Sequence, residues 1–147
     1  MIREFTAEEF RTNDDFFVFI KNFEKATNEI TVDIEYTRHK YAKLIDSGIA
    51  KVFVDEEDGV FRGAIGFIIS NDLHNGDKYA VESFWYVLPE HSGIGKSLFY
   101  AFEIEAKRIG CKRTAMIHLV DSYPERLKAF YEKSGYRLLE LHYIKEI

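Results

Sequence analysis

The stretch YAVESFWYVL, at 79–88, runs without a break into the glycine-containing loop PEHSGIGKS, and this junction constrains the fold more than any other feature of the sequence. The stretch is apolar nearly throughout, as expected for a strand buried on both faces. After the loop, apolar residues recur at helical spacing from Leu98 to Ile109, and Gly110 is a natural helix stop. A strand, a glycine loop and an amphipathic helix in direct succession predict an α/β fold.

Periodicity, caps and turn residues predict the other elements. They are a short strand over 1–6, a helix after the cap Asn13, a helix over 33–47, strands over 49–54 and 60–70 joined by the turn DEEDG, a strand over 113–120, a helix with a Ser122–Glu125 capping box that ends at Gly135, and a closing strand segment in 136–147. The resulting order, β-α-α-β-β-β-α-β-α-β, predicts an α/β sandwich with a mixed sheet. A length of 147 residues favours one domain, 1–147.

Composition excludes several classes of protein. Hydrophobic residues at 46% and aromatic residues at 16% are too frequent for a disordered chain. A net charge of -5 without a basic run argues against nonspecific nucleic-acid binding. No cluster of Cys and His has metal spacing, so no metal site is predicted.

Cysteine usage and hydropathy bear on location. Cys111 is the single cysteine, so no internal disulfide can form, which fits a reducing compartment. The N-terminal MIREFTAEEF lacks the basic and apolar regions of a signal peptide, and no apolar run is long enough to span a membrane. These features predict a cytoplasmic protein without membrane contact.

The loop has the composition of a phosphate site. Gly95-Lys96-Ser97 matches the end of a nucleotide-binding P-loop, but the leading glycine of that motif would fall on Glu90, whose carboxylate would oppose a triphosphate. A cradle at a helix N-terminus is the better interpretation, because Gly93 and Gly95 leave backbone N–H groups open and the helix dipole adds positive charge. A tight turn without a ligand is the alternative.

Two stretches together resemble one family. VLPEHSGIGKSLF resembles the coenzyme A loop of the GCN5-related N-acetyltransferases, or GNAT family, with Val87 and Pro89 at the strand end and Gly93-Ile94-Gly95 matching the family's G-x-[GA]. FYEKSGY, at 130–136, resembles the second signature of the family, and the two stretches stand in the expected order. The resemblance implies a GNAT-type fold, in which a mixed, mostly antiparallel sheet is flanked by helices on both faces.

The resemblance also implies a function and a binding site. It implies an acetyl-CoA-dependent N-acetyltransferase, in which a primary amine attacks the thioester directly in a ternary complex. Two parallel strands would splay apart around the pantetheine arm. The residues that would hold the coenzyme are Val87, Leu88, Ser92, Gly93, Ile94, Gly95, Lys96 and Ser97. No metal is implied.

Proton transfer requires a base for the amine and a donor for the thiolate. Tyr131 matches the family tyrosine that protonates the thiolate, and a phenol with a reference pKa of about 10 can donate at neutral pH; a core role is the alternative. Glu82 is the predicted base, because the family often has an acid in this strand and an acid in so apolar a strand is costly without a role. An ion pair for Glu82, and His118 as a rival base, stay open.

Some residues depart from the family pattern. Glu90 replaces a Gln or Arg near the pyrophosphate, and Pro124 stands where Asn is common. A non-catalytic GNAT-like module that binds coenzyme A or a protein therefore stays an alternative. The acceptor is expected to be a primary amine on a small molecule or peptide. Because the segment after Gly135 is short for the closing strands of the family, both a monomer and a homodimer are expected possibilities.

Overall fold

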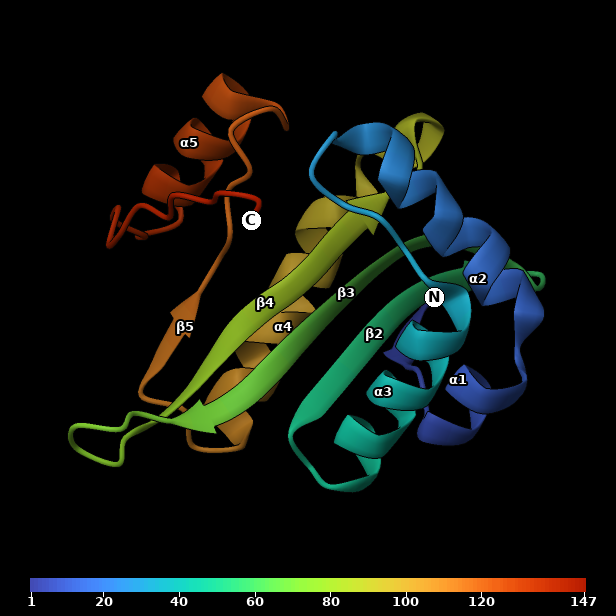
Figure 1. Ribbon diagram of the computed structural model, residues 1–147, viewed down its shortest axis with the longest axis horizontal. Coiled ribbons are helices and arrows are strands. Elements are labelled where there is room, and N and C mark those ends of the chain that lie inside the picture. Colours follow the sequence, from blue (N-terminus) through green and yellow to red (C-terminus); the bar gives the residue numbers. More distant parts are fainter. The chain divides into compact units, whose positions relative to one another are not determined.

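The computed structural model describes residues 1–147, which form two compact units, Met1–Ile117 and His118–Ile147. The first unit holds the whole sheet, and the second holds one helix (Figure 1). The elements are β1 (Ile2–Glu4), α1 (Ala7–Thr12), α2 (Asp14–Lys21), η1 (Asn22–Ala26), α3 (Ile34–Asp46), β2 (Ala50–Glu57), β3 (Val60–Asn71), β4 (Lys78–Val87), η2 (Pro89–His91), α4 (Ile94–Arg108), β5 (Arg113–Ala115) and α5 (Pro124–Lys133).

The sheet is mixed and mostly antiparallel, as predicted. Its strand order is β1-β2-β3-β4-β5, in which β4 and β5 are the parallel pair and the other neighbours are antiparallel. A parallel pair needs a crossover connection, and α4 supplies it. Figure 1 shows α4 behind the sheet and α1, α2 and α3 in front of it. Helices therefore flank both faces, which confirms the predicted fold class.

Turn and cap residues explain where several elements begin and end. Asp58 and Gly59 join β2 to β3 with φ angles of 52° and 80°, the conformation of a tight two-residue hairpin turn. The side chain of Asn13 accepts a hydrogen bond from the N–H of Phe16 at 3.1 Å, which confirms the predicted cap of α2. Gly48 follows α3 with a φ of 74°, and the helix Ile34–Asp46 agrees with the predicted helix over 33–47 to within one residue at each end.

The helix α1 was not predicted, although the sequence carries a signal for it. Thr6 and Glu9 form a capping box, in which the N–H of Glu9 donates to the Thr6 hydroxyl and the N–H of Thr6 donates to the Glu9 carboxylate. The T-x-x-E spacing in TAEE is the sequence pattern of that motif. The predicted strand over 1–6 therefore ends at Glu4 and leads directly into a helix.

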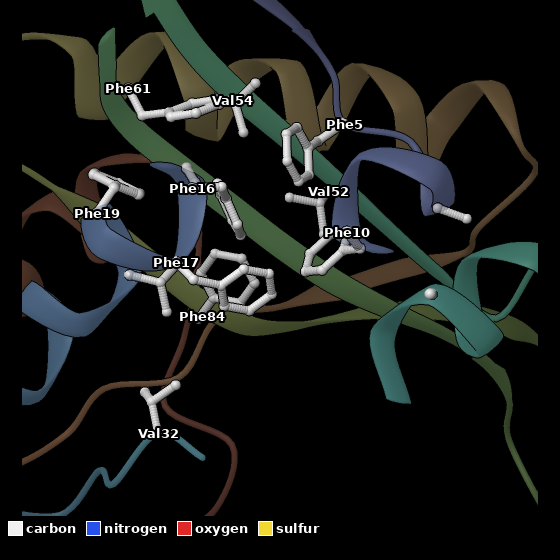
Figure 2. Packing of buried hydrophobic residues seen from close by; sticks show 14 residues of the cluster. Phe5, Phe10, Phe16, Phe17, Phe19, Val32, Val52, Val54, Phe61 and Phe84 are labelled. Carbon is white, nitrogen blue, oxygen red and sulfur yellow. The ribbon is translucent and has the colours of Figure 1, made fainter. Parts of the chain in front are cut away.

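A phenylalanine-rich cluster fills the space between the sheet and the first three helices (Figure 2). Phe5 is fully buried and touches Phe10 edge to face, at a centroid distance of 5.1 Å, and Phe16 at 4.3 Å. Val52 and Val54 of β2 contribute the floor of the cluster. Each fully buried side chain of this size stabilises the fold by about 1.5–3 kcal/mol.

A second cluster, the α4-side cluster, lies between the sheet and α4. The helix presents the buried side chains Leu98, Phe102 and Ala106 to Ile65 and Phe67 of β3. These three helix positions are the apolar face that helical spacing predicts. Close packing here depends on a glycine, because a Cβ added at position 63 would lie 2.8 Å from the Leu98 Cδ1.

Three predictions for the C-terminal part were wrong. The strand over 113–120 is only Arg113–Ala115, because its partner β4 pairs with it over three residues and the chain beyond has no ladder to join. Tyr123, not Ser122, is the N-cap of α5, with a φ of 46° and no side-chain cap. The segment 136–147 contains no strand, because alternating apolar residues form a strand only where a neighbouring strand accepts their hydrogen bonds.

Candidate active site

The candidate site begins where the parallel strands stop pairing. The ladder between β4 and β5 joins Tyr79 to Arg113, Ala80 to Thr114 and Val81 to Ala115, and then it ends. From there β4 continues to Val87 with β3 as its only strand partner. Beyond residue 81 no strand pairs with that edge of β4, as expected for strands that splay apart. Ligands of open α/β sheets bind at the carboxyl ends of such parallel strands.

Ser83 is the extra residue of a β-bulge at this point. Gly66 pairs with Phe84 and Phe67 pairs with Glu82, so Ser83 has no partner in β3. Bulges bend a strand, change the direction of the neighbouring side chains and occur often beside active sites. The bulge therefore sets the direction in which the Glu82 side chain points from the strand.

Glu82 has the burial and partners of a proton acceptor. Its side chain is 7% exposed, and its carboxylate accepts a hydrogen bond from the N–H of Ile117 at 2.9 Å. Burial raises the pKa of this carboxyl to about 7. The hydrogen bond from the Ile117 N–H lowers the pKa, but by less than burial raises it. A carboxyl with such a pKa can take up a proton near neutral pH and release it again.

Tyr41 and Ser83 form a second polar contact at the bulge, which no sequence pattern predicts. The Tyr41 hydroxyl donates a hydrogen bond to the Ser83 hydroxyl. Burial, with the nearby Glu82 carboxylate as a smaller cause, raises the pKa of Tyr41 to about 12, so this phenol stays protonated near neutral pH. No pattern in a single sequence marks a bulge, and therefore neither residue could be found in advance.

The glycine loop follows β4 directly and leads into α4. Val87 ends the strand, a short 3₁₀ turn covers Pro89–His91, and Gly93 is the N-cap of the helix. Gly93 has a φ of -64°, and a Cβ added there would meet no atom within 4 Å. Neither backbone strain nor internal packing therefore requires glycine at this position. Close approach of a ligand to the backbone would require glycine there.

Gly95 is different, because internal packing accounts for it. It is buried, and an added Cβ would lie 3.3 Å from Cζ2 of Trp85. Trp85 itself packs against the α4-side cluster and stacks obliquely near Phe99, with centroids 5.9 Å apart. The indole is therefore part of the core.

The N-terminus of α4 is open to an anion. It has neither a side-chain cap nor an acid in its first turn. The N–H of Gly95 donates to the Ser92 carbonyl at 3.4 Å, a long hydrogen bond, and the first N–H groups of a helix have no acceptor within the helix itself. Lys96 and Ser97 are exposed on that turn, beside the exposed Ser92. Glu90 lies in the preceding 3₁₀ turn, outside the helix. Backbone donors, the helix dipole and one cation are thus available at this end.

Tyr131 lies in the second unit, on α5. Its side chain is buried, and its ring meets those of Phe130 and Tyr136, each at a centroid distance of 6.0 Å. The His118 ring approaches it edge to face at 6.1 Å, with an interplanar angle of 77°. The structure therefore brings Tyr131 and His118 together in the second unit, while Glu82 and the loop that follows β4 both lie in the first unit.

No group of three or more His, Cys, Asp or Glu side chains is arranged to hold a metal ion. No helix has the length and apolar character needed to cross a bilayer.

The sequence matches the family model described as the acetyltransferase (GNAT) family over residues 12–136. This match covers most of the chain and includes elements of both units. No curated protein is similar enough in sequence to count as a relative.

Solved structures share the fold at low sequence identity. A ribosomal-protein-alanine N-acetyltransferase from Brucella melitensis biovar Abortus 2308 matches with a TM-score of 0.75 and 15% identity, over 100% of this chain and 98% of that chain. An aminoglycoside acetyltransferase from an uncultured soil metagenomic sample gives a TM-score of 0.78, 16% identity and coverages of 100% and 97%. An acetyltransferase from Trypanosoma brucei matches with a TM-score of 0.71 and 18% identity, over 100% of this chain and 99% of that chain.

Proposed function

The chain belongs to the GNAT family of acetyltransferases, and we propose that it transfers the acetyl group of acetyl-CoA to a primary amine by direct attack in a ternary complex. The observation that carries this proposal is the placement of Glu82. It is a buried carboxyl with a pKa of about 7, at the point where β4 and β5 separate and in the strand that leads into an open helix N-terminus.

The coenzyme would bind along the end of β4 and the start of α4. Its pyrophosphate would lie on the backbone from Ser92 to Ser97, where Gly93 leaves room and the Lys96 ammonium adds a positive charge. The backbone of Val87 and Leu88 would hold the pantetheine arm and the thioester carbonyl. Ile94 and Gly95 contribute N–H groups of the first helical turn. The proposed reaction uses no metal.

Acetyl transfer requires the amine to be neutral when it attacks. We assign Glu82 as the general base, which takes the ammonium proton directly or through a water molecule. The amine nitrogen then attacks the thioester carbon, a C–N bond forms, the C–S bond breaks, and the nitrogen releases its second proton to solvent. The electron pair of the C–S bond leaves with the sulfur as a thiolate.

Tyr131 is the proposed proton donor to the thiolate. It occupies the position of the family tyrosine in FYEKSGY, and a phenol is protonated at neutral pH. The proton that Tyr131 gives up is regained from solvent, so that amide and free thiol are the products. His118, whose ring contacts Tyr131, is the alternative candidate for proton transfer.

The acceptor is proposed only as a class, a primary amine on a small molecule or peptide. Solved structures of the same fold include enzymes named for a ribosomal-protein alanine and for aminoglycosides, which are amines of very different size. We propose that both units belong to one catalytic domain, since the family match runs through both. A reducing, cytoplasmic setting fits the single cysteine, Cys111.

Two measurements test the proposal. Isothermal titration should show binding of acetyl-CoA and no binding of ATP with Mg²⁺, and tight ATP binding would contradict the proposed cradle. Thiol release from acetyl-CoA should then be followed across a panel of primary amines. Binding without release for any amine would support a non-catalytic module, which the departures at Glu90 and Pro124 keep as the second candidate.

A further inference from the structure

Tyr41 connects α3 to the bulge of β4 through one hydrogen bond, from its hydroxyl to that of Ser83. Packing fixes the phenol ring on two sides. It stacks on Phe10 with a centroid distance of 5.2 Å and an interplanar angle of 8°, and it meets Phe84 edge to face at 5.8 Å. A ring held in this way presents its hydroxyl in one direction.

Ser83 lacks a register partner in both neighbouring strands. As the extra residue of the bulge, it has no partner in β3, and the ladder to β5 has already ended at Val81. Neither neighbouring strand therefore pairs with Ser83 in register. Its exposed hydroxyl accepts a hydrogen bond from the Tyr41 side chain.

Glu82 precedes Ser83, and its position depends on the same backbone. Its register partner is Phe67, which is fully buried in the α4-side cluster. A carboxyl that left this site would exchange a buried environment for water. Movement of the bulge by even a small amount would therefore change the hydration of Glu82.

We propose that Tyr41 is a positioning residue of the active site, which fixes the bulge through Ser83 and so keeps the Glu82 carboxyl in its buried position. This inference rests on the proposed function, because it assumes that Glu82 is the base. Within the first unit, the influences on the Glu82 carboxyl are its own burial and the Ile117 N–H, and Tyr41 is an ionisable side chain close enough to feel its charge.

The test compares Tyr41→Phe, Ser83→Ala and the double variant with the wild type. Tyr36→Phe is the matched control, because Tyr36 lies on the same helix and is 66% exposed. Carboxyl ¹³C NMR of the free protein gives the titration midpoint of Glu82, with the signal assigned by Glu82→Gln. Thiol release with the best amine of the panel gives kcat, KM and the acid limb of the pH profile.

Both single variants should lower the Glu82 midpoint by about half a pH unit or more, because water reaches the carboxyl. They should also lower kcat about fivefold, with acetyl-CoA affinity retained. The double variant should equal the single ones, since both remove the same contact. The control should match the wild type.

An unchanged midpoint in folded Tyr41→Phe and Ser83→Ala would overturn the inference, and so would additive shifts in the double variant. If Tyr41→Phe fails to fold, Ser83→Ala decides, because it truncates an exposed side chain. If no amine supports thiol release, the proposed function fails while the NMR midpoints still decide the positioning role. Shifted midpoints with an unchanged kcat would show that Tyr41 positions Glu82 and would contradict the assignment of Glu82 as the base.

Discussion

The carboxylate of Glu82 receives the N–H of Ile117 at 2.9 Å, in the place where a backbone carbonyl would be the partner if β4 and β5 continued to pair. Ile117 lies two residues beyond Ala115, the last paired residue of β5. A side chain thus satisfies a backbone donor that the end of the ladder would otherwise leave open. The separation of the two strands and the placement of the Glu82 carboxylate are therefore one feature.

Glu82→Gln should lower kcat/KM by about 10²-fold or more, because an amide cannot take up a proton. In the wild type, kcat/KM should rise with pH through a midpoint near 7, since the base acts when it is deprotonated and its pKa is about 7. The variant should lose this limb and keep its affinity for acetyl-CoA. Steady-state kinetics from pH 5.5 to 8.5 check both, and an unchanged acid limb would assign the base elsewhere.

The same substitution should change stability in a pH-dependent way. Folding raises the pKa of Glu82 above its ordinary value, so the stability that the protonated form provides is complete below about pH 4.5 and is lost as pH rises through about 7. Glu82→Gln should therefore be more stable than the wild type by about 3 kcal/mol at pH 8 and by less than about 1 kcal/mol at pH 5. Urea unfolding at the two pH values measures the difference, and equal differences would contradict the buried, uncharged state.

Gly93→Asp should separate binding from folding. Aspartate is a favoured N-cap residue and position 93 has room for a side chain, so the free energy of unfolding should stay equal or rise. Affinity for acetyl-CoA should fall about tenfold or more, because the carboxylate repels the pyrophosphate. Gly93→Asn is the matched control for size, and it should lose less affinity. Equal losses in the two variants would mean that crowding alone acts.

Tyr131→Phe should lower kcat at least about tenfold while the Kd of acetyl-CoA stays unchanged, because only the departing thiolate loses its proton donor. Tyr143→Phe is the control, since this tyrosine is 93% exposed. Single-turnover thiol release, with binding measured separately by titration, checks the prediction. An unchanged kcat would leave Tyr131 with its structural role among the rings of Phe130 and Tyr136.

Gly66→Ala should destabilise the first unit by about 1–3 kcal/mol, because its Cβ would lie 2.3 Å from Cε1 of the Phe84 ring. The phenyl ring stands directly opposite in the ladder and lies in the phenylalanine-rich cluster. Gly93→Ala, where the added carbon meets nothing, is the control and should change stability by less than about 1 kcal/mol. Thermal unfolding of the two variants provides the comparison.

Much of the fold could be predicted because local signals and the global fold agree. The cap at Asn13, the stop at Gly48 and the turn at Asp58–Gly59 each specify a boundary through their own chemistry. The loop residues from Ser92 to Ser97 were placed at a helix N-terminus for the same reason. Such features depend on neighbours in the sequence, which a single chain displays.

The features that could not be predicted depend on distant partners. The length of β5 is set by how far β4 pairs with it, and the pairing ends at Val81 for reasons absent from the sequence of 113–120. The hydrogen bond between Tyr41 and Ser83 joins residues from a helix and a bulge far apart in the chain. Roles for Glu82 and Tyr131 remain predictions that the experiments above decide.

The extra residue Ser83 shifts the alternation of side chains along β4 by one position. Before it, the even-numbered Ala80 faces the α4-side cluster; after it, the odd-numbered Trp85 and Val87 do, while Phe84 turns to the opposite core. Deleting this one exposed serine would remove the extra residue, so Phe84 and Trp85 would keep their faces and only the bulge beside Glu82 would be lost. Regular pairing with the serine retained would instead exchange the two sets of side chains between the cores, so both cores form only because Ser83 stands outside the ladder.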